Sequence, residues 1–171
     1  IGRIGSRFFA RSALFKYGFN WSPMYRRTTG RITHVSDDLR EVRLTIPLSY
    51  RNRNYVGSMY GGALFSAVDG ILMVQLINIL ENQYVVWDKS AEIFYRIPVR
   101  EDVFARFVFT PEDLDRIVTE AERHGEYEFE KVIELTDEPR SRVFCEVHKR
   151  LYVATRAHYR AKRATGRLHQ S

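Results

Sequence analysis

The segment from Asn54 to Asp69 contains residues whose types and spacing could stabilise an oxyanion and supply a base or nucleophile. Gly61 and Gly62 stand side by side where an apolar helix is expected to begin. The first backbone N–H groups of a helix lack intrahelical acceptors and lie at the positive end of its dipole. Such amides can stabilise charge that develops on a carbonyl oxygen, which is oxyanion-hole chemistry. The alternative is that the paired glycines only permit tight packing of helix on sheet.

The second candidate is Asp69, which lies between Val68 and Gly70 in a run that is otherwise almost entirely apolar. Burying an unpaired carboxylate is costly, so such a residue needs a partner or a chemical task. We interpret Asp69 as a general base or nucleophile. The structural alternative is a carboxylate that caps neighbouring backbone or pairs with a buried arginine. Asn54 could supply an amide that orients water or a carbonyl, or it could be an ordinary turn residue.

These residues must be positioned by strands grouped around one long apolar helix, which we expect from about Tyr60 to Leu80. A threonine N-cap, a proline and first-turn acids predict a short helix over 111–124 that ends at Gly125. Helices are missing between most strands, so the order favours an α+β fold in which an antiparallel sheet wraps the apolar helix. The sequence predicts strands at 31–37, 41–48, 84–97, 102–110, 127–135 and 142–154, with clear alternation of apolar residues at 41–48, 102–110 and 142–154.

Length and cysteine content exclude several classes of protein. The 171 residues suit a single domain, and 44% apolar with 28% charged residues exclude a disordered chain. A single cysteine, Cys145, excludes a disulfide scaffold and a structural zinc site; we interpret it as a buried thiol. The five histidines show no metal-ligand spacing, and His148 is predicted to be structural or exposed.

Polar residues, Asp69 among them, interrupt the apolar run of the expected central helix, so we expect a core helix and no stable membrane insertion.

The net charge of +6 belongs to the two ends of the chain. Residues 1–36 carry seven Arg or Lys residues, residues 156–171 carry five, and neither segment contains an acid, so residues 37–155 have a net charge of −6. The C-terminal segment has one aromatic ring, Tyr159, and lacks an interleaved stacking pattern for bases. We expect no nucleic-acid partner; a salt-sensitive nucleic-acid or membrane-surface binder is the rival hypothesis.

The basic N-terminal segment has Arg3, Arg7 and Arg11 at helical spacing. This spacing predicts an amphipathic helix packed on the domain, with a membrane-surface or transit role as the alternative. We divide the chain into an N-terminal basic helix (1–20), a central domain (21–155) and a basic C-terminal tail (156–171).

The chain resembles hotdog-fold proteins of the acyl-CoA thioesterase superfamily, in the phenylacetic-acid thioesterase (PaaI-like) branch, and within it an uncharacterised family of bacterial proteins. The resemblance covers roughly residues 20–155 and implies a hotdog domain. It also implies a homodimer with active sites between subunits, a tetramer being the alternative assembly, and we expect a cytoplasmic protein. The residues that carry the resemblance are Asn54, Gly57, Gly61, Gly62, Asp69, the segment 87–91, Ile93 and Pro98.

The resemblance implies a role for each candidate site residue. The backbone N–H of Gly61 would hold the thioester carbonyl, with Tyr60 and Gly62 beside it in the substrate site. Asp69 of the other subunit would act as base or nucleophile, and Asn54 would position the attacking water or the thioester. Coenzyme A enters as part of an acyl-CoA substrate, and no separate cofactor or metal is implied.

Four arginines are candidates for contact with the phosphates of coenzyme A, because a guanidinium suits bidentate phosphate recognition. The alternative for each is an exposed, solubilising side chain. The four are Arg51, Arg53, Arg96 and Arg100.

The chain departs from the thioesterase branch at two positions. Tyr60 stands where the branch commonly has histidine before the glycine pair, and Ile97 stands where it often has serine or threonine before Pro98. Thioester hydrolysis needs no protonation of its leaving group, so Asp69, Asn54 and the glycine pair could suffice. We therefore predict thioester hydrolysis; the alternative is a hotdog module that binds acyl-CoA or a lipid-like ligand without turnover.

Overall fold

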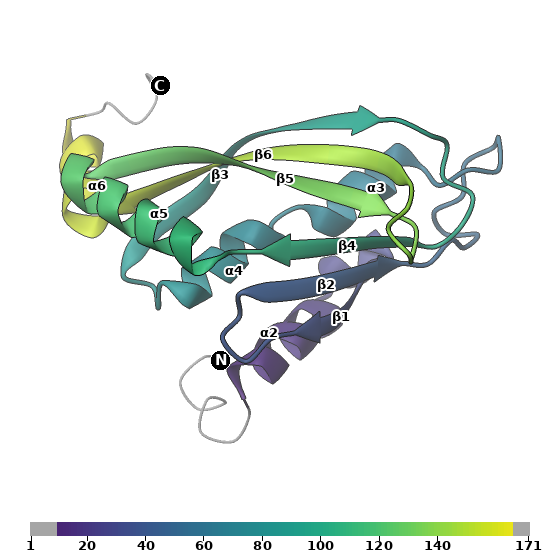
Figure 1. Cartoon of the computed structure of the whole chain (residues 1–171), viewed down its shortest axis with the longest axis horizontal. Helices are drawn as coiled ribbons and strands as arrows, with labels where there is room; N and C mark the ends of the chain where they lie inside the picture. The colour runs from purple at the N-terminus through teal and green to yellow at the C-terminus, as the bar shows by residue number, and fades with distance from the viewer. Residues whose placement is uncertain (1–9, 166–171) are drawn as a thin grey trace.

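The computed structural model describes residues 10–165, which form one six-stranded antiparallel sheet with helices on its faces and at its ends (Figure 1). The strands are β1 (Arg31–Val35), β2 (Glu41–Ile46), β3 (Tyr84–Tyr95), β4 (Val103–Val108), β5 (Glu126–Thr136) and β6 (Val143–Thr155). The helices are α2 (Arg11–Trp21), the 3₁₀ turn η1 (Tyr25–Thr28), α3 (Gly61–Val68), α4 (Ile71–Ile79), α5 (Pro111–His124) and α6 (Arg156–Ala164).

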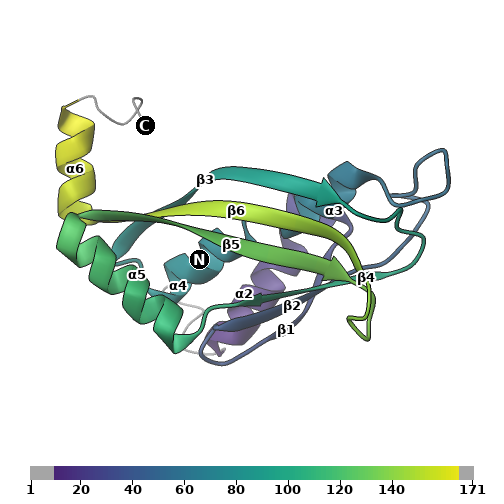
Figure 2. The same ribbon diagram turned by 45° about the horizontal axis from the view of Figure 1, so that its top comes forward.

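The strands follow the order β1-β2-β4-β5-β6-β3, so β1 and β3 are the edges of the sheet. The long strands β3, β5 and β6 curve over α3 and α4, as the two views show (Figures 1 and 2). Apolar side chains on the inner face of the sheet meet those of the helices, among them the buried Leu76, Val147 and Leu151. The predicted α+β hotdog arrangement, a sheet wrapped around a central helix, is confirmed.

The prediction of one continuous central helix from Tyr60 to Leu80 is wrong, because the chain breaks it between α3 and α4. Asp69 is extended, with φ −64° and ψ 137°, and Gly70 has a left-handed φ of 76°. A glycine adopts this φ without the steric cost that a Cβ atom imposes. The apolar pattern continues through both helices, so periodicity alone did not reveal the break.

By length and composition alone, the stretch Gly61–Ile79 could cross a membrane, with a mean hydropathy of 1.6. A core helix of a water-exposed domain passes the same test. In this fold the stretch forms the helix pair under the sheet, and Leu64, Ile71 and Leu76 are almost fully buried against it.

Helix α5 confirms the sequence prediction at both of its ends. The backbone N–H of Asp113 donates to Thr110 Oγ1 over 3.1 Å, and the N–H of Thr110 donates to Asp113 Oδ2 over 3.2 Å. This reciprocal pair is a capping box that satisfies two otherwise unpaired donors. Gly125, with φ 82°, ends the helix.

Each of the two basic segments contains a helix in its described part. The helix α2 begins at Arg11, packs Phe15 into the core and ends at Trp21; Arg3 and Arg7 of the predicted basic stripe lie outside the described residues. The predicted tail contains α6, which begins at a Thr155 cap. This helix was not predicted, because its pattern of basic residues lacks an apolar face long enough to predict packing.

Candidate functional site

The start of α3 presents two backbone donors without acceptors. The backbone N–H groups of Gly61 and Gly62 donate no hydrogen bond to any described residue. Tyr60 at the N-cap provides no side-chain acceptor for them. The first turn of α3 also contains no acid that would compensate the positive end of the helix. The glycine pair therefore exposes the type of donor that an oxyanion requires.

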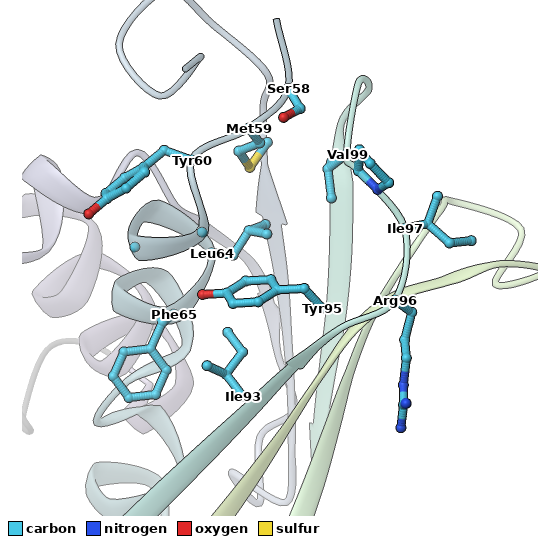
Figure 3. Close-up of a pocket in the computed structure, with 13 residues that line it drawn as sticks. Ser58, Met59, Tyr60, Leu64, Phe65, Ile93, Tyr95, Arg96, Ile97 and Val99 are labelled. Carbon is cyan, nitrogen blue, oxygen red and sulfur yellow. The ribbon is translucent and has the colours of Figure 1, made fainter. Parts of the chain in front are cut away.

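These donors open into a cavity of about 700 Å³ between the start of α3, the end of β3 and the loop that follows β3 (Figure 3). Most of its walls are apolar, which suits an acyl chain better than a charged ligand. Its lining comprises residues 58–62, Leu64, Phe65, Ile93 and residues 95–99.

Tyr95 extends from β3 across this cavity toward the first turn of α3 (Figure 3). Its phenol oxygen lies 2.6 Å from the position that a Cβ atom would occupy at Gly61. Burial, followed by the influence of Cys145 and of Tyr60, raises the pKa of Tyr95, so the phenol keeps its proton at neutral pH. Tyr95 was not among the predicted site residues. Alternation places it on the same side of the strand as Ile93, but no local pattern shows that this strand ends near the glycine pair.

Asp69 is not buried, which corrects the reason for which the sequence singled it out. Its side chain is 53% exposed at the junction of α3 and α4. One oxygen, Oδ1, accepts a hydrogen bond from Lys149 Nζ over 2.6 Å, whereas Oδ2 has no partner among residues 10–165. The carboxylate is therefore held at one oxygen and available at the other.

Lys149 is the second residue that the sequence analysis missed. Its side chain is only 3% exposed, and its Nζ lies 2.7 Å from Asp88 Oδ2 in addition to its contact with Asp69. Burial by itself lowers the pKa of Lys149. The hydrogen bonds to the two carboxylates and the charges of those carboxylates raise it by more, so the net pKa lies above its ordinary value. The alternation of the last strand could have predicted a buried lysine, because Lys149 falls between Val147 and Leu151 on the apolar face of β6.

Within one chain, Asp69 and the glycine pair are not brought together. Asp69 is not part of the cavity lining, and it follows Gly61 by eight residues along a helix. At a rise of 1.5 Å per residue this separation is about 12 Å, too far for one small substrate group to contact both. The described chain by itself therefore does not assemble a site that uses both groups.

Asn54 also lies outside the cavity lining, because its carboxamide organises its own turn. Its Oδ1 accepts hydrogen bonds from the N–H groups of Val56 and Ser58, each at 3.1 Å. Its Nδ2 donates to Ser58 Oγ over 2.9 Å. Asn54 therefore acts as an ordinary turn residue in this structure, which was the alternative to a role in orienting water or a carbonyl.

The four candidate arginines differ in how much of their charge is available. Arg51, Arg53 and Arg100 are exposed around the loops near the cavity. Arg96 lines the cavity but lies 3.2 Å from the Glu146 carboxylate, so part of its charge is compensated. Figure 3 shows the Arg96 side chain pointing away from the helix start.

The two departures from the thioesterase branch lie at opposite sides of the cavity. Tyr60 is 62% exposed and its ring covers Gly62, where a Cβ atom would come within 2.4 Å of Tyr60 Cε1. Ile97 is 45% exposed and lines the cavity with an apolar side chain. The Tyr60 hydroxyl lies 3.0 Å from the Cβ position at Gly62, so Tyr60 and Tyr95 each place a phenol beside the glycine pair, whereas Ile97 offers no polar group.

Metal chemistry has no ligand cluster to support it in the described part of the chain. His148 is half-buried on the outer face of the sheet between Glu130 and Glu146, at 3.1 Å and 3.6 Å. Cys145 is buried, as predicted, and burial raises the pKa of its thiol to about 12, so it is not a nucleophile at neutral pH.

With this geometry in place, comparison with known proteins identifies the family. The model of a domain of unknown function, DUF4442, matches residues 11–153. The chain belongs to this family. No curated protein matches the DUF4442 chain in sequence.

Solved structures similar to this DUF4442 protein have the same fold. A Pseudomonas aeruginosa protein of unknown function, described as a probable thioesterase, has 23% identity and a TM-score of 0.74, with 84% of this chain and 95% of that chain covered. A Chlorobaculum tepidum protein of unknown function has 19% identity and a TM-score of 0.66, with 84% and 93% covered. A thioesterase from Haemophilus influenzae has 15% identity and a TM-score of 0.57, with 81% and 87% covered. At these identities the similarity establishes the hotdog fold.

Proposed function

We propose that this protein hydrolyses an acyl-CoA thioester at a site formed between two copies of the chain. The observation that carries the proposal is the apolar cavity of about 700 Å³ into which the unpaired amides of Gly61 and Gly62 open. A thioester has an apolar acyl chain and a carbonyl oxygen that gains negative charge during attack. The apolar cavity suits the acyl chain, and the unpaired amides suit the carbonyl oxygen.

Asp69 of one subunit completes the site beside Gly61 of the partner subunit. Its free Oδ2 takes a proton from water as the water oxygen attacks the carbonyl carbon; direct attack by the carboxylate is the alternative route. The C–S bond then breaks, the thiolate leaves without prior protonation, and the proton held by Asp69 passes to the thiolate or to solvent. On the alternative route the carboxylate forms an anhydride with the acyl group as the thiolate leaves, and water then hydrolyses that anhydride. A carboxylic acid and free coenzyme A are the products, and Asn54 acts indirectly by shaping the turn before α3.

The unpaired edge of the sheet supports a homodimer. β3 is a twelve-residue edge strand whose outer backbone groups have no neighbouring strand within residues 10–165. Phe94 and Tyr95 near its end are 39% and 56% exposed. Long, uncovered edges with exposed aromatic rings favour pairing with another strand, and a second β3 is the symmetric partner. Sedimentation or light scattering separates this dimer from a tetramer.

The phosphates of coenzyme A are proposed to lie among the exposed arginines of the loops that adjoin the cavity lining in sequence, Arg51, Arg53 and Arg100, with Arg96 contributing less because of Glu146. Replacing any of the first three by glutamine is expected to raise KM and leave kcat nearly unchanged, since phosphate contacts bind the substrate and its transition state alike.

Release of free thiol from a panel of acyl-CoA thioesters tests the proposal. We expect turnover of at least one member and loss of turnover in Asp69→Asn with binding kept. Asp115→Asn is the matched control, because Asp115 is exposed on α5 and makes no ion pair with another described residue. Absence of thiol release from every member, with the assembly intact, would overturn the proposal.

A second candidate function is an acyl-CoA-binding module without turnover, and the engagement of Asn54 within its own turn favours it. A non-hydrolysable thioether analogue of acyl-CoA distinguishes the two functions. Both predict that the analogue raises the melting temperature of wild type and of Asp69→Asn. Only hydrolysis predicts thiol release from the matching thioester by wild type.

A further inference from the structure

We infer that Lys149 is a positioning residue that holds the Asp69 carboxylate in one orientation, with Oδ1 fixed and Oδ2 directed outward. The inference rests on the proposed function, in which Asp69 is the base or nucleophile. It goes beyond that function by assigning a role to a side chain on β6, which is 80 residues distant from Asp69 in sequence.

The contact joins three parts of the fold at one ammonium group. Lys149 comes from β6, Asp88 from β3 and Asp69 from the junction of α3 and α4, and both carboxylates lie within 2.7 Å of Nζ. A lysine whose side chain is 3% exposed needs such counter-charges, because burial disfavours an isolated ammonium. The three groups together carry a net charge of −1, so the lysine does not remove the negative charge that the base requires.

Backbone irregularities in two elements create the meeting point. The extended Asp69 and the left-handed Gly70 turn the chain out of the helix, so the Asp69 side chain leaves the helical face that it would otherwise share with Phe65. In β3 the register with β6 shifts between Asp88 and Ser90. Both irregularities lie next to a carboxylate that binds Lys149, which is typical of backbone features that aim a side chain.

The two carboxylates are held differently. Asp88 is 20% exposed, and its Oδ1 is buried without a hydrogen-bond partner among the described residues. Asp69 is 53% exposed and keeps Oδ2 available. Asp88 therefore anchors the lysine from the inner side, and the lysine anchors Asp69 at the surface. Lys149 also lies 5.9 Å from the ring centroid of Phe65, which lines the cavity.

The kinetic test compares Lys149→Met and Lys149→Arg with wild type. We expect Lys149→Met to lower kcat by about tenfold to a hundredfold through misplacement of the base. KM should change less than threefold, and Lys149→Arg should retain more activity than Lys149→Met because it keeps a charged donor. Lys131→Met is the matched control, since Lys131 lies on β5 and binds Asp113 over 2.7 Å, away from the site. A wild-type kcat in folded Lys149→Met would overturn the inference.

A second measurement does not depend on activity or on the folding of Lys149→Met. In protein labelled with ¹⁵N-lysine, the Lys149 ammonium signal is assigned by its loss in Lys149→Arg. We expect Asp69→Asn, a change at an exposed side chain, to shift this signal, whereas the control Asp115→Asn leaves it in place. An unchanged signal in Asp69→Asn would overturn the inference even if wild type hydrolyses thioesters. A shifted signal in a protein that hydrolyses none would support the contact and reject the proposed function alone.

Discussion

The phenol oxygen of Tyr95 lies 2.6 Å from the place where a Cβ atom would stand at Gly61. A side chain at position 61 and the ring of Tyr95 therefore cannot both keep their places. This relationship links the end of β3 to the start of α3, and it explains why the first residue of the helix is glycine in terms of space rather than backbone conformation. It also places the phenol beside the two unpaired amides.

Gly61→Ala is predicted to impair activity more than stability. The new methyl group displaces the half-exposed Tyr95 ring at small cost to the fold, but it crowds the carbonyl-binding end of the cavity. We expect kcat/KM to fall by about tenfold or more, short of the hundredfold to thousandfold cost of losing an oxyanion donor because the backbone N–H remains, with the melting temperature nearly unchanged. The control compares Tyr95→Ala alone with the double variant that also carries Gly61→Ala. Without the Tyr95 ring, Gly61→Ala should reduce kcat/KM by less. An equal effect in both backgrounds would refute crowding by Tyr95.

Gly70→Ala is predicted to destabilise the protein by about 1 kcal/mol or more, because a Cβ atom is disfavoured at left-handed φ. Gly70 has φ 76° and open space around it, so strain rather than collision is the cause. Gly18→Ala is the matched control: Gly18 lies within α2, has open space and lacks a positive φ. It should stabilise by about 0.5–1 kcal/mol. Urea unfolding of both variants measures the difference, and effects of the same sign would contradict the prediction.

Thr110→Ala is predicted to lower the free energy of unfolding by about 1 kcal/mol through loss of the α5 cap. The same substitution at Thr119, exposed in the middle of α5, should be neutral or stabilising by a few tenths of a kcal/mol, because alanine has the higher helix propensity. Chemical denaturation of the two variants checks the contrast. Equal destabilisation would mean that the cap hydrogen bonds contribute nothing beyond propensity.

Glu41 is predicted to make stability depend on pH in the acid range. Its hydrogen bonds to Arg106 and Arg43 lower its pKa to about 2. A carboxyl whose pKa is lower in the folded chain than in the unfolded chain, where it is about 4.3, stabilises the fold above that value. This contribution, about 1 kcal/mol for a pair with exposed arginines, is lost as the pH falls from about 4.3 toward 2.

Thermal unfolding of Glu41→Gln between pH 2 and pH 7 tests this dependence. The variant should be less stable than wild type at pH 7, and the two should converge near pH 2. Glu138→Gln is the control, since Glu138 is exposed and forms no ion pair within residues 10–165. Parallel curves for Glu41→Gln and wild type would contradict the assignment.

Local signals in the sequence determined most of the secondary structure and one half of the candidate site. Alternation, with apolar runs bounded by turn residues, predicted all six strands within a few residues, and the Thr110 cap with Gly125 predicted both ends of α5. The glycine pair marked the start of α3. These features depend on neighbours in the chain, so a reader of the sequence can see them.

Tertiary structure alone decided which side chains meet. The sequence singled out Asp69 because it interrupts an apolar run, yet Gly70 turns it to the surface and Lys149 binds it from across the sheet. Tyr95 reaches Gly61 only because β3 ends over the start of α3. Such contacts depend on strand register and on the turn at Gly70, and neither is encoded in a periodic pattern. The sequence by itself therefore determined the elements and the candidate donors, and the packing of distant elements determined what holds the candidate base.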